Sequence, residues 1–180
     1  VVPIIEGRPF LVHGEARLAA AVPSSEWVQA LGGPLPDAAP AERALLAEHF
    51  TGWALAEHAS IAAFARFSLQ LLALGAPPEL VERATQAMTD ETRHARLGFA
   101  LVHALADSPV GPGDLPIDAA VATEPSLAEV LQLTVREGMI GETLAALEVR
   151  AGATLMAPSY LRGELERVAA DETRHAELAY

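Results

Sequence analysis

The hexapeptide DETRHA occurs twice, at 90–95 and at 171–176, and each copy contains a Glu-x-x-His pair. The two pairs are Glu91 with His94 and Glu172 with His175. Positions i and i+3 of an α-helix lie on nearly the same face, so each glutamate and its histidine project side by side. Carboxylate oxygen and imidazole nitrogen together suit Fe, Mn and Zn. The repeat therefore points to transition-metal chemistry supplied from two sides of one site.

Two more glutamates lie in apolar surroundings upstream of the repeats. Glu57 lies in WALAEHASIA (53–62), and Glu142 lies in MIGETLAA (139–146). A buried carboxylate without a partner costs several kcal/mol, and four that face one another also repel. Two divalent cations would balance the four negative charges. The sequence therefore predicts a site for two metal ions.

Four helices must position these residues. Stretches rich in Ala and Leu predict helices at 41–74, 79–106 and 126–156, and a fourth that begins at Pro158 and Ser159. The third begins with a capping-box pattern, Ser-x-x-Glu. Short turns make the first and second helices antiparallel neighbours, and likewise the third and fourth. Each half is therefore a helical hairpin, and the two hairpins pack about an approximate two-fold axis.

A Pro- and Gly-containing crossover at 108–125 joins the two halves. Residues 1–40 form a non-helical N-terminal arm, in which PFLVHGEARLA (9–19) predicts a small hairpin that turns at His13-Gly14. We therefore divide the chain into this arm and a four-helix bundle at 41–180. The predicted fold class is all-α.

Composition excludes several classes of protein. The chain has 180 residues, no cysteine and a formal net charge of −12. Disulfides, thiolate metal sites and Fe–S clusters are therefore excluded. The absence of a basic stripe argues against nucleic-acid binding, and no run of 18 uncharged apolar residues predicts a membrane span. A cytoplasmic location is favoured, but a start at Val1 without Met indicates a fragment, and a signal peptide could have preceded it.

One Glu from each of two helices, with Glu-x-x-His from each of the other two, is the di-metal signature of ferritin-like bundles. The chain matches this signature in order over roughly 41–180 and so resembles the ferritin-like superfamily, with a ligand set similar to those of bacterioferritin, rubrerythrin and di-iron oxidases. The resemblance implies six metal ligands, through which catalysis would run: Glu57, Glu91, His94, Glu142, Glu172 and His175. It also implies that Glu91 and Glu172 bridge two metals about 3.5–4 Å apart, with the other four as terminal ligands.

An aspartate precedes the glutamate of each repeat. A metal-bound histidine usually donates its other N–H to a carboxylate. We therefore expect Asp171 to orient His94, and Asp90 to orient His175. The alternative is that both aspartates are solvated surface groups.

Several positions beside Glu142 bear on what such a site could do. Met139 stands where rubrerythrins carry an extra Glu, so ligand switching of the rubrerythrin type is not expected. Glu137 is expected to lie well off the face of Glu142. Gly138 and Gly141 either ease close helix packing or leave a small cavity for O₂ or peroxide.

The predicted function is the reaction of Fe(II) with O₂ or peroxide, and two iron ions are the expected cofactor. Two Mn ions or an Mn/Fe pair would satisfy the same ligands. The sequence fits both a ferroxidase, which needs no further substrate, and an oxidase of an organic substrate, whose further electrons would come from an external donor. Two alternatives belong to other classes: a homo-oligomer that stores or delivers iron, and a metal-free helical interaction module.

Overall fold

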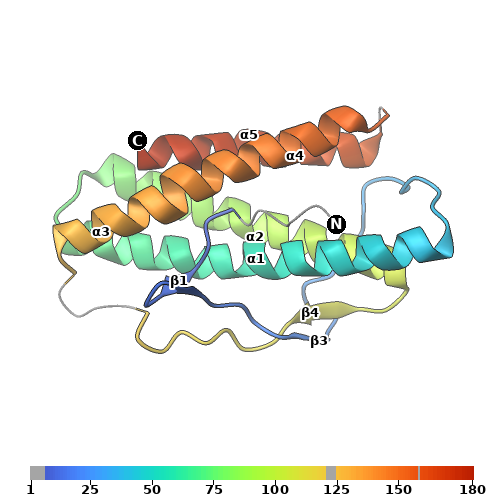
Figure 1. Cartoon of the computed structure of the whole chain (residues 1–180), viewed down its shortest axis with the longest axis horizontal. Coiled ribbons are helices and arrows are strands. Elements are labelled where there is room, and N and C mark those ends of the chain that lie inside the picture. The colour runs from blue at the N-terminus through green and yellow to red at the C-terminus, as the bar shows by residue number, and fades with distance from the viewer. Residues whose placement is uncertain (1–6, 121–124, 158) are drawn as a thin grey trace.

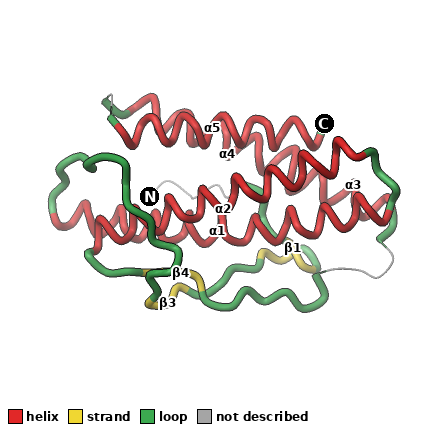
Figure 2. The backbone as a smooth tube through the Cα atoms, turned by 180° about the vertical axis from the view of Figure 1, so that it is seen from behind, coloured by secondary structure: helices red, strands yellow, loops and turns green. Residues whose placement is uncertain are grey.

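The computed structural model describes residues 7–120, 125–157 and 159–180, and the chain is mostly helical (Figure 1). The helices lie in two layers, each containing an antiparallel pair, and the arm and the crossover run along one side of them (Figure 2). Among the described residues, no helix is long and apolar enough to cross a membrane. The mostly helical structure is consistent with the predicted all-α class, and only short strands lie beside the helices.

The first layer is the hairpin of α1 (Pro40–Ala73) and α2 (Pro78–Ala106), as the sequence predicts. Gly75 ends α1 with a φ of +66°, a conformation that favours glycine. Pro78 begins α2 at the first helical position, where its missing N–H costs nothing. This tight turn makes the two helices antiparallel neighbours.

The second layer contains a continuous helical rod of three parts, which is less regular than predicted. The parts are α3 (Leu127–Leu133), the π-helix η1 (Thr134–Glu142) and α4 (Thr143–Leu155). The expected capping box is present, since Ser126 Oγ accepts from the Glu129 N–H at 3.2 Å and the Glu129 carboxylate accepts from the Ser126 N–H at 3.1 Å.

The π-helix has a consequence for Glu142. In a regular α-helix, residues seven apart lie on the same face, so Glu142 would point the same way as Val135. The wider turn of the π-helix changes this phase. Val135 is therefore exposed to solvent, while Glu142 is fully buried.

The second layer is completed by α5 (Tyr160–Ala179). The predicted start is close, because Ser159 caps the helix by accepting a hydrogen bond from the Arg162 N–H at 3.1 Å. Pro158 lies outside the described residues. The helix packs against both η1 and α4, which places the second DETRHA segment opposite the first.

Two short antiparallel sheets tie the non-helical segments together. In the first, β1 (Leu11–Val12) and β2 (Glu15–Ala16) form the predicted hairpin, and the positive φ angles of His13 and Gly14 fit its two-residue turn. In the second, β3 (Ala21–Pro23) of the arm pairs with β4 (Val110–Pro112) of the crossover. Residues 121–124 of the predicted crossover lie outside the described residues.

The N-terminal arm contributes to the core. Phe10 and Val12 are each 2% exposed, and they pack against Ala59 and Ala63 of α1. This packing holds the start of the arm against the helices that carry the candidate site. The division of the chain into two domains at residue 40 stays a prediction.

Candidate metal centre

The six ligand residues predicted from the sequence meet between the two layers of helices. Helix α1 supplies Glu57, α2 supplies Glu91 and His94, η1 ends at Glu142, and α5 supplies Glu172 and His175. All six are 0–2% exposed, although each carries a polar or charged group. Their burial is unusual for carboxylates and calls for partners that neutralise them.

The six residues form two overlapping groups whose ligand atoms all lie within 4.8 Å of one another. The first group is Glu57, Glu91, His94 and Glu172, and the second is Glu91, Glu142, Glu172 and His175. Glu91 and Glu172 belong to both groups. These buried side chains could hold a metal ion, and the arrangement offers one imidazole and three carboxylates to each of two positions.

Both histidines point Nδ1 into the cluster. Nδ1 of His94 lies 3.0 Å from Glu172 Oε1, and Nδ1 of His175 lies 3.0 Å from Glu91 Oε1. Each histidine thus approaches the glutamate of the opposite repeat, and Nδ1 of His94 is also 3.5 Å from Glu57 Oε2. The contacts across the repeats follow the approximate two-fold relation of the two hairpins.

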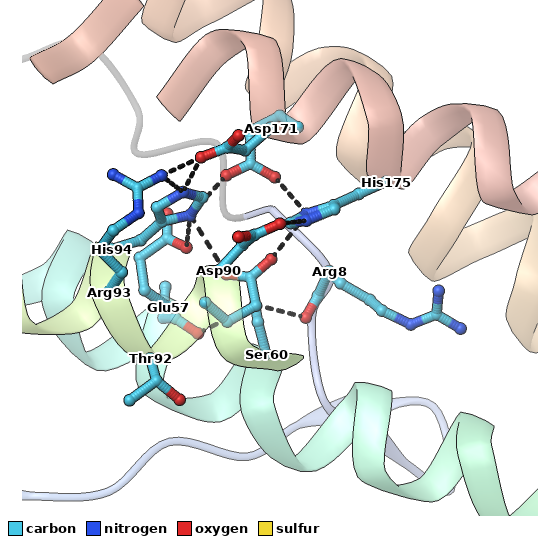
Figure 3. Close-up of polar contacts among 12 residues, drawn as sticks. Arg8, Glu57, Ser60, Asp90, Thr92, Arg93, His94, Asp171 and His175 are labelled. Carbon is cyan, nitrogen blue, oxygen red and sulfur yellow. Dashed lines mark hydrogen bonds and ion pairs between the residues drawn. The ribbon is translucent and has the colours of Figure 1, made fainter. Parts of the chain in front are cut away.

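The opposite ring nitrogen of each histidine faces an aspartate (Figure 3). Nε2 of His94 lies 3.1 Å from Asp171, and Nε2 of His175 lies 3.4 Å from Asp90. These are the partners that the sequence assigns to each histidine. Arg174 contacts both aspartates, so both carboxylates are charge-paired although Asp90 and Asp171 are only 9% and 7% exposed. The role of the aspartates in orienting metal ligands stays a prediction.

Burial and mutual repulsion divide the four glutamates into two kinds. Burial, followed by the charge of Glu91, raises the pKa of Glu57 well above its ordinary value. Burial and the charge of Glu172 do the same to the pKa of Glu142. For Glu91 and Glu172, burial acts to raise the pKa, but contacts with the histidines help to outweigh it and the pKa is lowered. The environment thus favours the neutral form of Glu57 and Glu142 and the ionised form of Glu91 and Glu172.

The histidines respond to the same charges. Burial acts to lower the pKa of His175, but hydrogen bonds with Asp90, Glu172 and Glu91 outweigh it and raise the pKa to about 12. The pKa of His94 is likewise raised, chiefly by Glu172, against the effect of burial. Protons on the histidines thus stand in for the positive charge that a metal would supply.

Several buried polar atoms in the cluster make no hydrogen bond among the described residues, although some of them lie within ion-pair distance of a neighbour. They include both carboxylate oxygens of Glu91, both of Glu142, and Nδ1 of His94. An orphaned buried acceptor costs about 1–3 kcal/mol, and more when it is charged. Oxygen and imidazole donors that converge without partners are the chemistry expected of a divalent transition-metal site, so the residues present fit such ions.

The beginning of the arm, residues 7–12, lies directly over the cluster, and we call this segment the strap. Ser60 Oγ of α1 donates a hydrogen bond to the carbonyl of Arg8 at 2.8 Å. A Cβ atom added to Gly7 would lie 3.4 Å from Glu142 Oε2. The strap therefore forms part of the wall of the site, which the sequence did not predict.

The strap is held by a buried charge cluster that the sequence analysis missed. Arg8 Nε lies 3.6 Å from Glu137 Oε2, and Arg66 of α1 pairs with the same carboxylate. The Leu11 N–H donates to Glu137 Oε1 at 3.3 Å. Burial lowers the pKa of Arg8 and raises that of Glu137, against their mutual attraction. One carboxylate thus anchors the strap to both η1 and α1.

The predicted position of Glu137 was wrong, because the third helix was taken as a regular α-helix. In a regular helix, Glu137 and Glu142 lie about 140° apart. The π-helix brings residues five apart onto one face, and Glu137 is 1% exposed beside the strap. No local signal in the sequence marks this change of helical phase.

The two glycines of η1 serve close packing. A Cβ atom added to Gly141 would lie 2.5 Å from the carbonyl oxygen of Gly7. One added to Gly138 would lie 2.6 Å from Cβ of Ala179. Of the two roles left open by the sequence, the structure supports close packing rather than a cavity beside Glu142.

A search against models of known protein families, curated proteins and solved structures finds no match to this chain.

Proposed function

We propose that this chain is a di-metal carboxylate protein of the ferritin-like superfamily that reacts Fe(II) with O₂ or peroxide. The observation that carries the proposal is the pair of overlapping groups that share Glu91 and Glu172. Two positions that share two carboxylates suit two metals bridged by those carboxylates. Glu57 with His94, and Glu142 with His175, would then complete the two positions as terminal ligands.

Charge balance supports two divalent ions rather than one. If all four glutamates bind metal in their ionised form, they carry four negative charges in a site where all are buried. A single divalent ion would leave two buried negative charges without a partner, which costs several kcal/mol. Two divalent ions balance all four, and the histidines then bind as neutral imidazoles through Nδ1. Iron is favoured by the mixed oxygen and nitrogen ligand set, and manganese fits the same ligands.

Bound iron would supply the electrons and the affinity for the oxidant. The residues of the chain would orient the metal ligands and exchange protons. Asp171 and Asp90 would accept hydrogen bonds from the Nε2–H groups of His94 and His175 and so fix the direction of Nδ1. Glu57 and Glu142 could take up or release protons as the charge of the site changes, because their pKa values are raised.

The enclosure of the site favours small reactants. All six ligand residues are at most 2% exposed, and the strap covers them on the side of Glu142. Two hollows on the surface, one along α1 and α2 and one beside Thr92 and Arg93, are lined by none of the six residues. We therefore favour ferroxidase chemistry with O₂ or peroxide over oxidation of an organic substrate.

The experiment is a stopped-flow titration of the metal-free protein with Fe(II), followed by O₂, with O₂ consumption and near-ultraviolet absorbance recorded. The proposal predicts fast oxidation that saturates at two Fe(II) per chain. The double variant E57A/E142A should fold but oxidise iron at the buffer rate. Glu48→Ala, an exposed change on α1, is the matched control and should behave as wild type. Oxidation that is no faster than buffer in the wild type would overturn the proposal.

Other outcomes of this experiment would indicate other functions. Uptake of many irons per chain would indicate storage in an oligomer. A metal-free interaction module predicts no metal binding and a more stable E57A/E142A variant, because the variant removes two buried carboxyl groups. Under the present proposal that variant gains stability only in the absence of metal.

A further inference from the structure

The rod formed by α3, η1 and α4 carries a continuous apolar line on its outer side. We call it the outer stripe, and its residues are Leu127, Leu131, Val135, Ile140, Leu144 and Leu147. Each is between 42% and 58% exposed. The rod lies on the near side of the upper layer in Figure 1, with no other element in front of it. Single exposed leucines are ordinary on a protein surface, but a line of six is not.

The outer stripe exists because of the π-helix. Leu127, Leu131 and Val135 follow one another in steps of four, and the next member, Ile140, comes after a step of five. The five-residue step falls inside η1, where successive turns are wider. The same change of phase that buries Glu142 therefore keeps the apolar residues before and after it on one outward line.

The spacing along the rod is symmetric. Leu127, Leu131 and Val135 lie 14, 10 and 6 residues before position 141. Leu147, Ala151 and Leu155 lie 6, 10 and 14 residues after it, and Leu155 is 89% exposed. An antiparallel copy of the rod would set each member of the first triplet opposite one of the second. A two-fold axis near position 141 produces this pairing, whereas an unrelated partner would not require it.

The area of the stripe is sufficient for a specific contact between copies. The stripe from Leu127 to Leu147 is about 30 Å long and a helix is about 10 Å wide, which gives about 300 Å² of stripe per copy. Patches of this size mark interaction sites. Two copies would cover about 600 Å² through the stripe, and Leu155 and the flanking side chains would bring the total toward the 1,200–2,000 Å² of stable interfaces.

The charge of the stripe also permits pairing. Two copies each carry a net charge of −12, so self-association must not bring acidic groups together. The outer stripe contains no acidic residue, and both signs of charge lie beside it, with Arg136 and Arg150 on one hand and Glu129 and Glu148 on the other. From these observations we infer that two copies of this chain dimerise through their outer stripes, with the rods antiparallel across a two-fold axis near position 141. This inference does not depend on the metal.

Sedimentation velocity of the wild-type chain between about 1 and 100 µM tests the inference, since weak dimers populate this range. The expected mass is twice the 18.9 kDa of one chain. The double variant V135K/L147K should sediment as a monomer, because it buries four ammonium groups at the interface. Leu45→Lys and Leu69→Lys, at exposed positions on α1, should remain dimeric. A monomeric wild type, or a dimer broken only by the α1 changes, would overturn the inference.

Disulfide trapping tests the geometry in the intact chain, which has no cysteine of its own. Ile140→Cys lies next to the axis and should form a linked dimer on oxidation. Leu127→Cys alone should not, because its opposite number is Leu155. The double variant L127C/L155C should link two chains. The two positions lie at opposite ends of one rod and cannot link within a chain, whereas the antiparallel pairing brings position 127 of one copy to position 155 of the other. Linking by L127C alone, or none by I140C, would contradict the antiparallel pairing.

Discussion

Asp171 on α5 lies 3.1 Å from Nε2 of His94 on α2, and the same imidazole presents Nδ1 to Glu172 at 3.0 Å. The imidazole therefore lies between two carboxylates, with Asp171 at Nε2 and Glu172 of the cluster at Nδ1. Asp171 Oδ2 also pairs with Arg93, and Oδ1 with Arg174. Asp171 thus connects two arginines to the imidazole of a candidate metal ligand.

Replacing Asp171 by Ala should weaken metal binding about 10–100-fold, the usual cost of removing the carboxylate that orients a metal-bound histidine. The imidazole of His94 would lose the acceptor that selects its tautomer. Competition with a chelator of known affinity measures the change. Asp118→Ala, at an exposed position in the crossover, should leave the affinity unchanged. Equal affinities for wild type and Asp171→Ala would show that the aspartate has no part in metal binding.

The stability of the metal-free protein should fall as pH rises from about 6 to about 9. The pKa of His175 is raised to about 12, so its stabilising contribution is complete below its ordinary value of 6.5 and is lost above it. The raised pKa of Glu57 acts in the same direction, because the buried carboxyl favours its neutral form. Urea unfolding at the two pH values measures this change.

Metal binding should change with pH in the opposite sense. The metal must displace protons from the histidines and from Glu57 and Glu142, so affinity should rise with pH.

A metal-free protein that gains stability between about pH 6 and about pH 9 would contradict this assignment of the protons. The metal-free protein should also lose stability below pH 4.5, the ordinary pKa of glutamate. The pKa of Glu172 is lowered in the folded state, so protonation of this carboxylate favours the unfolded chain.

Replacing Glu137 by Gln should destabilise the fold by about 3–5 kcal/mol, because it leaves two buried guanidinium groups without a carboxylate. The two groups belong to Arg8 and Arg66, which are 1% and 4% exposed. Arg8→Met should cost less. In that variant, Glu137 keeps its pair with Arg66, and the Met side chain can pack where the Arg8 guanidinium now lies over the Phe64 and Phe67 rings. Urea denaturation of the two metal-free variants makes the comparison, and an equal cost would mean that the ion pairs do not anchor the strap.

Replacing Gly141 by Ala should displace the strap, since the new Cβ atom would lie 2.5 Å from the Gly7 carbonyl oxygen. Faster proteolysis of the N-terminal arm and faster metal exchange are the expected results. Gly152→Ala, on the same rod, is the matched control because nothing lies within 4 Å of its added Cβ. That change should stabilise the helix by about 0.5–1 kcal/mol and leave the arm intact. If both variants resist proteolysis as the wild type does, the strap is not held by its contact with η1.

Much of the site could be predicted because its residues follow helical spacing. Glu91 and His94 are three apart, and so are Glu172 and His175, and a regular helix places each pair together. Pro and Gly indicated the ends of the helices, because their effects on the backbone are local and do not depend on the fold. The pairing of Asp171 with His94 followed from a general property of metal-bound imidazoles, whose free N–H group needs a hydrogen-bond acceptor.

The parts that could not be predicted depend on a change of helical phase and on contacts between distant segments. Nothing local in the sequence distinguishes a π-helix from an α-helix at 134–142, so Glu137 was assigned to the wrong face. The ion pair of Arg8 with Glu137 joins residues far apart in the chain. The pairing of β3 with β4 is also long-range, and their three-residue sequences, AVP and VGP, are too short to show an alternating pattern.

The number of metal ions bound per chain tests the central claim most directly. Native mass spectrometry of the chain reconstituted with Fe(II) without oxygen, and with Mn(II), gives this number without relying on activity. We expect two ions per chain for the wild type and a loss of both from the E57A/E142A variant, whose circular dichroism should remain helical. A wild-type chain that binds no ion would mean that the paired DETRHA segments form a buried polar cluster rather than a metal centre.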